Sequence, residues 1–377
     1  MVTVVGFCAI YIILYSAFVL KLYLGLGRLP EIFLTDAKPA IGFSLIIPLR
    51  NEAQNLPRLL ESIAALDYPR ELFEVIFIDD ASGDDSPAII NRWRMQHGLV
   101  TTTLIENIQI TASPKKNAIL RAMPIARFDW VITTDADCSL PQNWLRAFNG
   151  YIEKSNVEMV AAPVVFTRVR GLLASFQRLD FLSLQAVTLG SFGIDRPFMC
   201  NGANLAYTKK LFREAGGFQG NEAIASGDDV FLLQRVASLC PEKLGYLKSR
   251  DAIVETLPEK TIGRLLNQRV RWAAKANSYE NDYADELAGI TFLSNLFLLA
   301  SCILAGCGFV PMLWAVVLFG YKLIIDWLFL AKADKFLKNF QIVFPVFAAI
   351  VHPVFIVGVA LYAAFGKYAW KGRKFRV

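Results

Sequence analysis

The stretch Trp130-Val-Ile-Thr-Thr-Asp-Ala-Asp137 joins a short apolar run to two carboxylates that lie two residues apart. Its β-branched residues are typical of a buried strand. Similar runs come before it, each followed by a helical pattern, at Phe43–Pro48, Phe73–Ile78 and Thr102–Ile105. Strands that alternate with helices predict an α/β fold, in which a mostly parallel sheet carries helices on both faces.

The segments between these runs have the periodicity of amphipathic helices. We expect helices near Ala53–Leu66, Pro87–Gln96 and Lys115–Ala126, and another that opens at Pro141. Ligands of such sheets bind beyond the carboxyl ends of the strands. Because Asp79-Asp80 and Asp135-Ala-Asp137 both follow strands, we expect both groups to face one site.

The remaining sequence is too apolar for a single soluble domain, since 55% of the 377 residues are hydrophobic. A helix of about 20 apolar residues crosses a bilayer. Runs of that length cover Met1–Leu20, Leu287–Tyr321 and Phe340–Gly366. The middle run continues to Ala331, and Pro311 interrupts it where a turn can join two helices. The sequence thus predicts an integral membrane protein with four candidate spans.

We divide the chain into an N-terminal transmembrane anchor (1–26), an α/β domain (40–280), C-terminal membrane helices (287–366) and a basic tail (367–377). A cleaved signal peptide is the alternative for the first run. That run lacks a basic start and a small-residue cleavage site, which favours a retained anchor. The last apolar segment either crosses the membrane or, with Pro345 and Pro353 as kinks, is re-entrant and keeps the basic tail inside.

Two amphipathic segments, near 170–190 and 260–276, are predicted to be helices at the membrane surface. Packing on the domain core explains the first of them equally well. Lys322 and Asp326 lie one helical turn apart inside an apolar run and are expected to neutralise each other.

Composition also excludes several classes of partner and site. A membrane explains the net charge of +6, and we find no nucleic-acid motif, so no nucleic-acid partner is expected. The six cysteines show no paired spacing, which indicates reduced thiols. His97 and His352 are the only histidines, too few for a histidine metal site, and we interpret both as structural.

Asp135 and Asp137 are the candidate metal ligands. Side chains two apart on a strand start on one face, so both carboxylates can close on a single cation. Mg²⁺ or Mn²⁺ suits carboxylate oxygens together with substrate phosphates, and offsets charge on a departing diphosphate. A capped turn is the alternative. Asp79 and Asp80 are interpreted either as acceptors for a nucleobase or ribose, or as helix caps.

Further charged groups have two interpretations each. Lys115 and Lys116 open a helix and suit phosphate, although a solvated helix face is the common role of such lysines. Asp228-Asp229 either caps a helix or supplies a general base. In Gln268-Arg-Val-Arg-Trp272, Arg271 offers a planar fork for a diphosphate and Trp272 a flat face for a sugar ring. The alternative is a basic helix at the membrane surface.

In this order, the residues between about Phe43 and Trp272 resemble the membrane-bound family 2 glycosyltransferases, which include cellulose, chitin and hyaluronan synthases and ceramide glucosyltransferase. The resemblance implies a GT-A fold and a nucleotide-sugar donor. Asp135-Ala-Asp137 resembles the DxD motif, which holds the metal and the diphosphate. Gly227-Asp228-Asp229 resembles the motif of the catalytic base, with Asp228 where glutamate is usual, and implies that Asp229 is the base.

The resemblance implies roles for other residues as well. The motif QxxRW matches Gln268, Arg271 and Trp272. The strand ends that hold the nucleotide match Pro48, Arg50, Glu52, Asp79 and Asp80. The loop that lines the donor sugar and the acceptor matches Asn201, Gly202, Ala203 and Asn204.

The implied reaction is inverting transfer of a sugar to a membrane-associated acceptor. Processive synthases need enough spans to enclose a polymer channel, and four helices are few for that, so a lipid acceptor is favoured over a polysaccharide. A catalytically inactive scaffold is the third possibility. We expect membrane lipids as partners and a cytosolic catalytic domain at a bacterial inner membrane.

Overall fold

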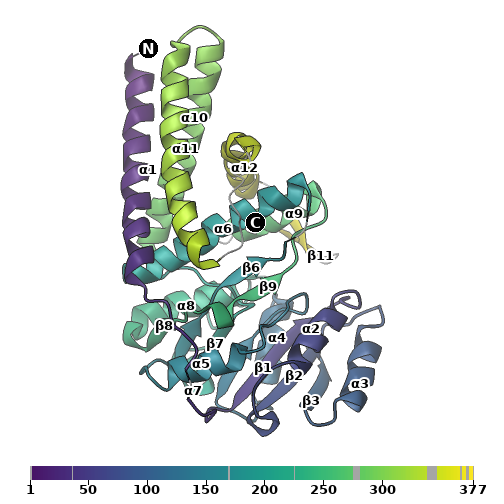
Figure 1. The fold of residues 1–377 in the computed structure, drawn as a ribbon. Coiled ribbons are helices and arrows are strands. Elements are labelled where there is room, and N and C mark those ends of the chain that lie inside the picture. The colour runs from purple at the N-terminus through teal and green to yellow at the C-terminus, as the bar shows by residue number, and fades with distance from the viewer. Residues whose placement is uncertain are drawn as a thin grey trace. The chain divides into compact units, whose positions relative to one another are not determined.

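The computed structural model describes residues 2–35, 37–168, 170–224, 226–274, 281–337, 346–365, 367–370 and 373–376. The predicted kink at Pro345 and residues 275–276 of the second predicted surface helix lie outside these ranges. The chain forms two compact units (Figure 1). Unit 1 comprises residues 1–29, 168–198 and 258–377, and unit 2 comprises residues 30–167 and 199–257.

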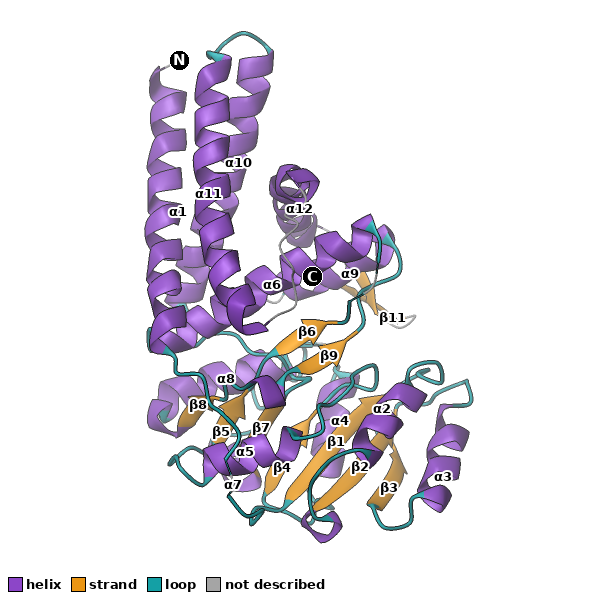
Figure 2. Cartoon of the chain, in the orientation of Figure 1, coloured by secondary structure: helices purple, strands orange, loops and turns teal. Residues whose placement is uncertain are grey.

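Unit 2 is built on a sheet of seven strands in the order β3-β2-β1-β4-β7-β5-β8 (Figure 2). The strands are β1 (Phe43–Leu49), β2 (Phe73–Asp79), β3 (Thr101–Glu106), β4 (Trp130–Thr133), β5 (Met159–Ala161), β7 (Leu205–Thr208) and β8 (Leu244–Tyr246). Only β7 runs antiparallel to its neighbours β4 and β5. The predicted mostly parallel α/β sheet is confirmed.

Helices and a small second sheet complete unit 2. The helices are α2 (Leu56–Ala64), α3 (Ser86–Gln96), α4 (Pro114–Ala122), α5 (Trp144–Ile152), α7 (Lys209–Glu214) and α8 (Asp228–Leu239). Three short 3-10 helices, η1 (Arg70–Leu72), η2 (Pro241–Lys243) and η3 (Arg250–Ala252), lie between elements. Strands β6 (Val164–Phe166) and β9 (Val254–Thr256) pair in parallel.

Strand burial explains why unit 2 holds its shape. Every residue of β2 is buried, and β1 is buried except for a half-buried Pro48. Such strands read as continuous apolar runs because helices cover both sheet faces. One predicted boundary is wrong. The segment after β4 first makes a turn in which Pro141 accepts from the Trp144 amide, so α5 begins at Trp144 and not at Pro141.

Unit 1 contains the other helices that the structure describes. They are α1 (Val2–Arg28), α6 (Leu172–Gly193), α9 (Ile262–Ala273), α10 (Asp282–Gly306), α11 (Met312–Leu337) and α12 (Val346–Phe365). Three segments of the described residues are long and apolar enough to cross a membrane: Gly6–Arg28, Asp282–Gly306 and Met312–Leu337. The fourth predicted span contains a shorter apolar helix, Ile350–Ala364. In the tail, β10 (Lys367–Trp370) pairs antiparallel with β11 (Arg373–Arg376).

Helix α11 contains an internal ion pair. Lys322 Nζ donates to Asp326 at 2.6 Å, which confirms the predicted neutralisation. Tyr15 adds a second hydrogen bond to the same carboxylate, also at 2.6 Å. All six cysteines are free thiols, as predicted.

The two predicted surface segments belong to unit 1 together with the apolar helices. Helix α6 packs against α1, where Gly25, Gly190 and Gly193 let the two backbones touch. A Cβ added at Gly190 would lie 2.7 Å from the Leu22 carbonyl oxygen. Small residues permit such close helix crossings in membranes. The α/β domain predicted from sequence, residues 40–280, therefore contains residues of both units.

Candidate active site

The candidate site of unit 2 starts where β4 ends. The Thr133 hydroxyl donates to the Gly202 carbonyl oxygen at 2.8 Å, which fixes the loop 200–204 beside that strand end. The next residues carry Asp135 and Asp137. Asp135 has a side chain that is 41% exposed, so this carboxylate is accessible to a ligand.

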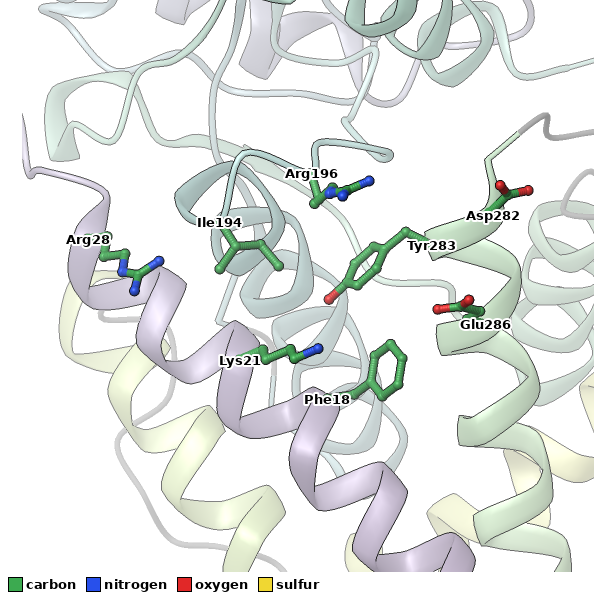
Figure 3. Close-up of a pocket in the computed structure, with 8 residues that line it drawn as sticks. All are labelled: Phe18, Lys21, Arg28, Ile194, Arg196, Asp282, Tyr283 and Glu286. Atoms are coloured by element: carbon green, nitrogen blue, oxygen red, sulfur yellow. The ribbon is translucent and has the colours of Figure 1, made fainter.

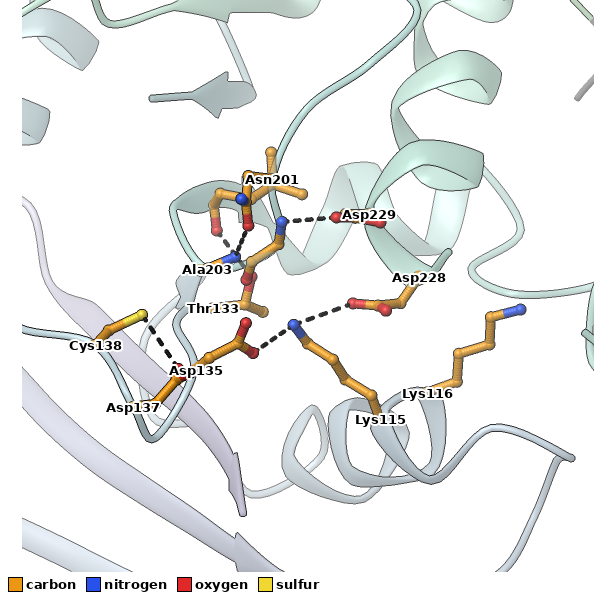
Figure 4. Close-up of polar contacts among 12 residues, drawn as sticks. Lys115, Lys116, Thr133, Asp135, Asp137, Cys138, Asn201, Ala203, Asp228 and Asp229 are labelled. Carbon is orange, nitrogen blue, oxygen red and sulfur yellow. Dashed lines mark hydrogen bonds and ion pairs between the residues drawn. The ribbon is translucent and has the colours of Figure 1, made fainter. Parts of the chain in front are cut away.

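Lys115 joins two parts of the chain that are distant in sequence (Figure 4). Its Nζ lies 2.6 Å from the Asp135 carboxylate and 3.8 Å from that of Asp228, at the start of α8. Burial disfavours its charged form, but the carboxylates of Asp135, Asp228 and Asp229 outweigh this effect and raise the pKa of Lys115. The lysine therefore stays cationic at neutral pH.

Asp229 lies on the other side of this cluster. One carboxylate oxygen accepts from the Gly202 amide at 2.7 Å, and the other from the Val230 amide at 2.8 Å. Gly227, the residue before α8, has φ of 85°, a left-handed conformation that glycine adopts readily. After this turn the Asp228 carboxylate points towards Lys115, as Figure 4 shows, and the Asp229 carboxylate bonds to the Gly202 amide.

Gly202 is packed closely against the charged cluster. A Cβ built there would lie 3.1 Å from Lys115 Nζ, 3.2 Å from the Asp228 carboxylate and 3.2 Å from Asp229 Cβ. No larger residue fits without displacing one of these charged groups. The side chain of the preceding residue, Asn201, accepts from the Ala203 amide and holds the loop closed.

A second acidic group lies at the end of β2. Asp79 accepts from the Ser82 amide, and Asp80 accepts from the Asn107 side chain at 2.9 Å. Arg50 donates to the Asp80 carbonyl and lies 3.5 Å from its carboxylate. The two strand ends, β1 and β2, are thus tied to each other.

The loop after β1 is fixed by the loop after β2. Asn51, with φ of 53°, donates its amide to the Ser82 hydroxyl, and the Glu52 amide donates to the Ser86 hydroxyl. The Glu52 carboxylate accepts from Asn55 at 2.6 Å. Pro48 lies within β1. These contacts give Arg50, Glu52, Asp79 and Asp80 defined positions.

Three predicted site residues of unit 2, Lys116, Ala203 and Asn204, are buried. Lys116 is fully buried, and its Nζ donates to both oxygens of Asn221 and to the Ile224 carbonyl, away from the carboxylate cluster (Figure 4). Asn204 is also fully buried, and its amide group bonds to Pro163, Ala252 and Trp144. Ala203 is 2% exposed. The structure therefore differs from the predicted phosphate contact of Lys116 and acceptor contacts of Ala203 and Asn204.

The predicted QxxRW residues belong to unit 1. Gln268 accepts from Arg269 and donates to Glu259 at 3.4 Å. Trp272 lies 4.2 Å beneath the Arg269 guanidinium and 6.2 Å from the Phe181 ring. Arg269 itself pairs with buried Asp180 at 2.6 Å, and the charge of Arg269 helps to lower the pKa of this carboxyl despite burial, which acts to raise it. Arg271 lies on the same helix.

Sequence reasoning missed several positioning residues. Thr133 was assigned only to a strand, and Asn107 to no element, because a lone hydroxyl or amide gives no local signal. Tyr207 is buried in β7, and burial together with the charge of Asp228 raises its pKa. The Thr133 and Asn107 side chains bond to segments that are distant in sequence, so no single strand reveals these contacts.

No group of three or more His, Cys, Asp or Glu side chains suited to a metal ion occurs in the part of the chain that the structure describes. Two carboxylates are enough for a cation that takes its other ligands from a substrate diphosphate and from water, as Mg²⁺ commonly does. Asp135 and Asp137 supply two such carboxylates. Asp137 also lies beside the Cys138 thiol, at 3.8 Å.

Curated relatives of the chain are glycosyltransferases. It is 25% identical over 229 residues to glycosyltransferase AglE of Haloferax volcanii, which covers 60% of this chain and 70% of that protein. It is 26% identical over 245 residues to β-monoglucosyldiacylglycerol synthase of Synechocystis, covering 63% of this chain and 48% of that protein. The chain thus spans about half of the second relative.

A solved structure with the same fold is a mannosyltransferase of Pyrobaculum calidifontis in complex with GDP-Man and Mn²⁺. It is 18% identical, with a TM-score of 0.67, and the match covers 96% of this chain and 99% of that chain. The family model described as glycosyl transferase family 21 matches residues 2–377. Fold, relatives and family model agree with the predicted resemblance: the chain is a glycosyltransferase and belongs to glycosyl transferase family 21.

Proposed function

We propose that this protein transfers one sugar from a nucleotide-sugar donor to a lipid acceptor, with inversion at the anomeric carbon and with a divalent cation. The observation that carries the proposal is the Lys115 bridge in unit 2. It joins Asp135, at the end of β4, to Asp228, at the start of α8, with Asp229 beside them. One site thereby combines a cation for phosphate with carboxylates for a metal and a base.

The charges of the site indicate which residues contact the nucleotide-sugar donor. Lys115 is a half-buried cation that a diphosphate oxygen can contact, and charge-assisted bonds of this kind are strong. Asp79 and Asp80 lie at the end of β2, where they are suited to accept from a nucleobase or ribose. The donor roles of Gln268 and Arg271, and the sugar contact of Trp272, remain proposals that rest on the family resemblance.

Asp229 is our candidate for the general base. As the acceptor oxygen forms its bond to the anomeric carbon, the bond from that carbon to the diphosphate oxygen breaks, and the acceptor proton passes to the Asp229 carboxylate. A single displacement inverts the anomeric centre. The two backbone amides that donate to Asp229 hold its carboxylate in place.

Asp135 and Asp137 would hold the cation. When bound, a divalent cation offsets the negative charge that builds on a departing diphosphate. Mn²⁺ accompanies GDP-Man in the Pyrobaculum structure, which supports the use of Mg²⁺ or Mn²⁺ here. Removing divalent ions from purified protein with EDTA should abolish transfer, and Mn²⁺ or Mg²⁺ should restore it. Full activity in EDTA would refute the proposed metal dependence.

The name of the Synechocystis relative, a glucosyldiacylglycerol synthase, supports a lipid acceptor. Other relatives are poly-β-1,6-N-acetyl-D-glucosamine synthases of Staphylococcus epidermidis, so polymer synthesis is the second candidate. The three apolar helices associate the protein with a membrane. We propose that its catalytic unit faces the cytosol of a bacterial inner membrane.

The test is to incubate membranes that contain the protein with a panel of radiolabelled sugar nucleotides and to separate the products. We expect label from one donor in the lipid extract, as a single added sugar. Long labelled polysaccharide from the purified protein would favour the polymer synthase. If no donor gave any product and Asp229→Asn left the cellular phenotype unchanged, the inactive scaffold would be favoured.

A further inference from the structure

A cavity of about 550 Å³ lies within unit 1 (Figure 3). Three segments line it: the second half of α1, the turn after α6 and the first two turns of α10. The lining residues are Phe18, Lys21, Arg28, Ile194, Arg196, Asp282, Tyr283 and Glu286. None of them belongs to the carboxylate cluster of unit 2, and the proposed transfer reaction assigns no role to this cavity.

Cations outnumber carboxylates on the cavity wall. Lys21, Arg28 and Arg196 are exposed, and among the described residues no carboxylate oxygen lies within 4.0 Å of their side-chain nitrogens. Asp282 and Glu286 are both on α10, on one side of the cavity in Figure 3. The cavity thus offers unpaired positive charge on one side and hydrogen-bond acceptors on the other.

Tyr283 supplies a further sign of a ligand. Its hydroxyl oxygen is buried and has no hydrogen-bond partner among the described residues. A buried hydroxyl without a partner is unfavourable, and a ligand oxygen would satisfy it. Figure 3 shows this hydroxyl directed into the cavity, between Lys21 and Arg196. The Tyr283 and Phe18 rings lie 5.8 Å apart and form an apolar wall beside it.

Several of the lining residues lie at the ends of helices that are apolar enough to cross a membrane. Lys21 and Arg28 are in the last turns of the segment Gly6–Arg28, and Asp282 begins the segment Asp282–Gly306. Basic and aromatic side chains at such ends meet the lipid head groups, because their apolar parts lie along the helix while their polar tips reach the interface.

We propose that this cavity binds the head group of an anionic membrane phospholipid. Lys21 and Arg196 contact the phosphate oxygens, Arg28 adds positive charge, and Tyr283 donates its hydroxyl. Asp282 and Glu286 disfavour a multiply charged phosphate and accept from hydroxyl groups. This combination fits a singly charged phosphodiester that carries a hydroxylated substituent, as in phosphatidylglycerol.

The test uses full-length protein in nanodiscs of neutral phosphatidylcholine, titrated with fluorescent phosphatidylglycerol. We expect one saturable site in the wild type. Replacing both Lys21 and Arg196 with Gln should weaken binding at least tenfold, since each lost charge-assisted contact costs about a factor of ten. Replacing Lys260 and Arg264 with Gln is the matched control, because these exposed cations of unit 1 do not line the cavity.

Further arms identify the ligand. Tyr283→Phe keeps the ring and should weaken binding severalfold without loss of folded protein. Soluble glycerol phosphate should not displace the lipid; displacement by it at equal concentration would assign the site to a free phosphate and overturn the lipid proposal. Equal affinities of the cavity variant and the control variant would also overturn it.

Sugar transfer and lipid binding can be separated. Asp229→Asn should abolish transfer while it leaves the affinity for phosphatidylglycerol unchanged, because Asp229 lies in unit 2 and does not line the cavity. If the transfer reaction were disproved, the lipid titration would still stand as an independent measurement.

Discussion

Two adjacent lysines, Lys115 and Lys116, have the same local sequence signal and opposite surroundings. The Lys115 ammonium faces Asp135 and Asp228, whereas that of Lys116 is enclosed by carbonyl and amide oxygens and lies 5.2 Å from the Phe231 ring. A helix turns by about 100° per residue, so neighbours point to different sides. The different contacts of the two side chains therefore assign Lys115 to the proposed site and Lys116 to the stability of unit 2.

Replacing Lys115 with Met should reduce transfer about 10- to 100-fold, because a lost charge-assisted contact costs about 1.5–3 kcal/mol. The melting temperature of this variant should change little, since the removed cation faces an accessible site. Steady-state rates and thermal unfolding in detergent measure the two effects. Lys210→Met, at a lysine that is 58% exposed, is the control and should retain full activity. Equal activity of the two variants would contradict the role of Lys115.

Replacing Lys116 with Met should have the reverse effect. The oxygens of Asn221 and Ile224 would lose their donor inside the protein, which costs about 1–3 kcal/mol of stability. We expect a lower melting temperature, with the turnover of the remaining folded protein largely retained. A loss of turnover without a loss of stability would instead support the phosphate contact predicted from sequence.

Gly202 makes a third residue-scale prediction. Gly202→Ala should lower turnover by about 10- to 100-fold, because overpacking costs about 1–3 kcal/mol and here acts on Lys115, Asp228 and Asp229 at once. Gly83→Ala is a matched control in the same unit, since nothing lies within 4 Å of a Cβ added there. Equal turnover of the two variants would show that space at Gly202 does not limit the reaction.

At the scale of elements, the close crossing of α1 and α6 holds distant parts of unit 1 together. The backbones touch at Gly25, Gly190 and Gly193, and only small residues allow that approach. Sequence periodicity identified an amphipathic helix near 170–190 but not its partner, because the apolar face of a helix does not specify what covers it. The structure assigns that partner.

Gly190→Ala should therefore lower the melting temperature of the detergent-solubilised protein, since the added Cβ meets the backbone and side chain of Leu22 and the helices must separate. Overpacking of this kind costs about 1–3 kcal/mol. Gly320→Ala in α11 is the matched helical control, with nothing within 4 Å of the new carbon. Similar melting temperatures for both variants would show that the crossing is not tightly packed.

At the scale of the whole molecule, the sequence predicted the elements and motifs that have a local pattern. It missed the contacts that form between distant segments. Strand runs such as Phe73–Ile78 gave the mostly parallel sheet, because buried strands are apolar throughout. The DxD pair and Asp228-Asp229 were found as charged motifs. The antiparallel β7, the Thr133 contact and the burial of Asn204 arise from pairing between distant segments, which carries no local signal.

Local sequence patterns also did not predict the partition into two units. Residues 168–198 and 258–274 read as parts of the α/β domain by position, but they pack with the apolar helices because their own apolar faces need that cover. Hydrophobic runs identify membrane helices, whereas the element that packs on them is known only from the fold.

The most direct test of the proposed active site in unit 2 compares donor binding and transfer in wild type and Asp229→Asn. If Asp229 is the base within a site whose donor contacts come from Lys115 and Asp135, transfer should fall by about 10²- to 10⁴-fold, while the affinity for the nucleotide sugar changes little. Retained transfer, or affinity lost in proportion to transfer, would contradict the account.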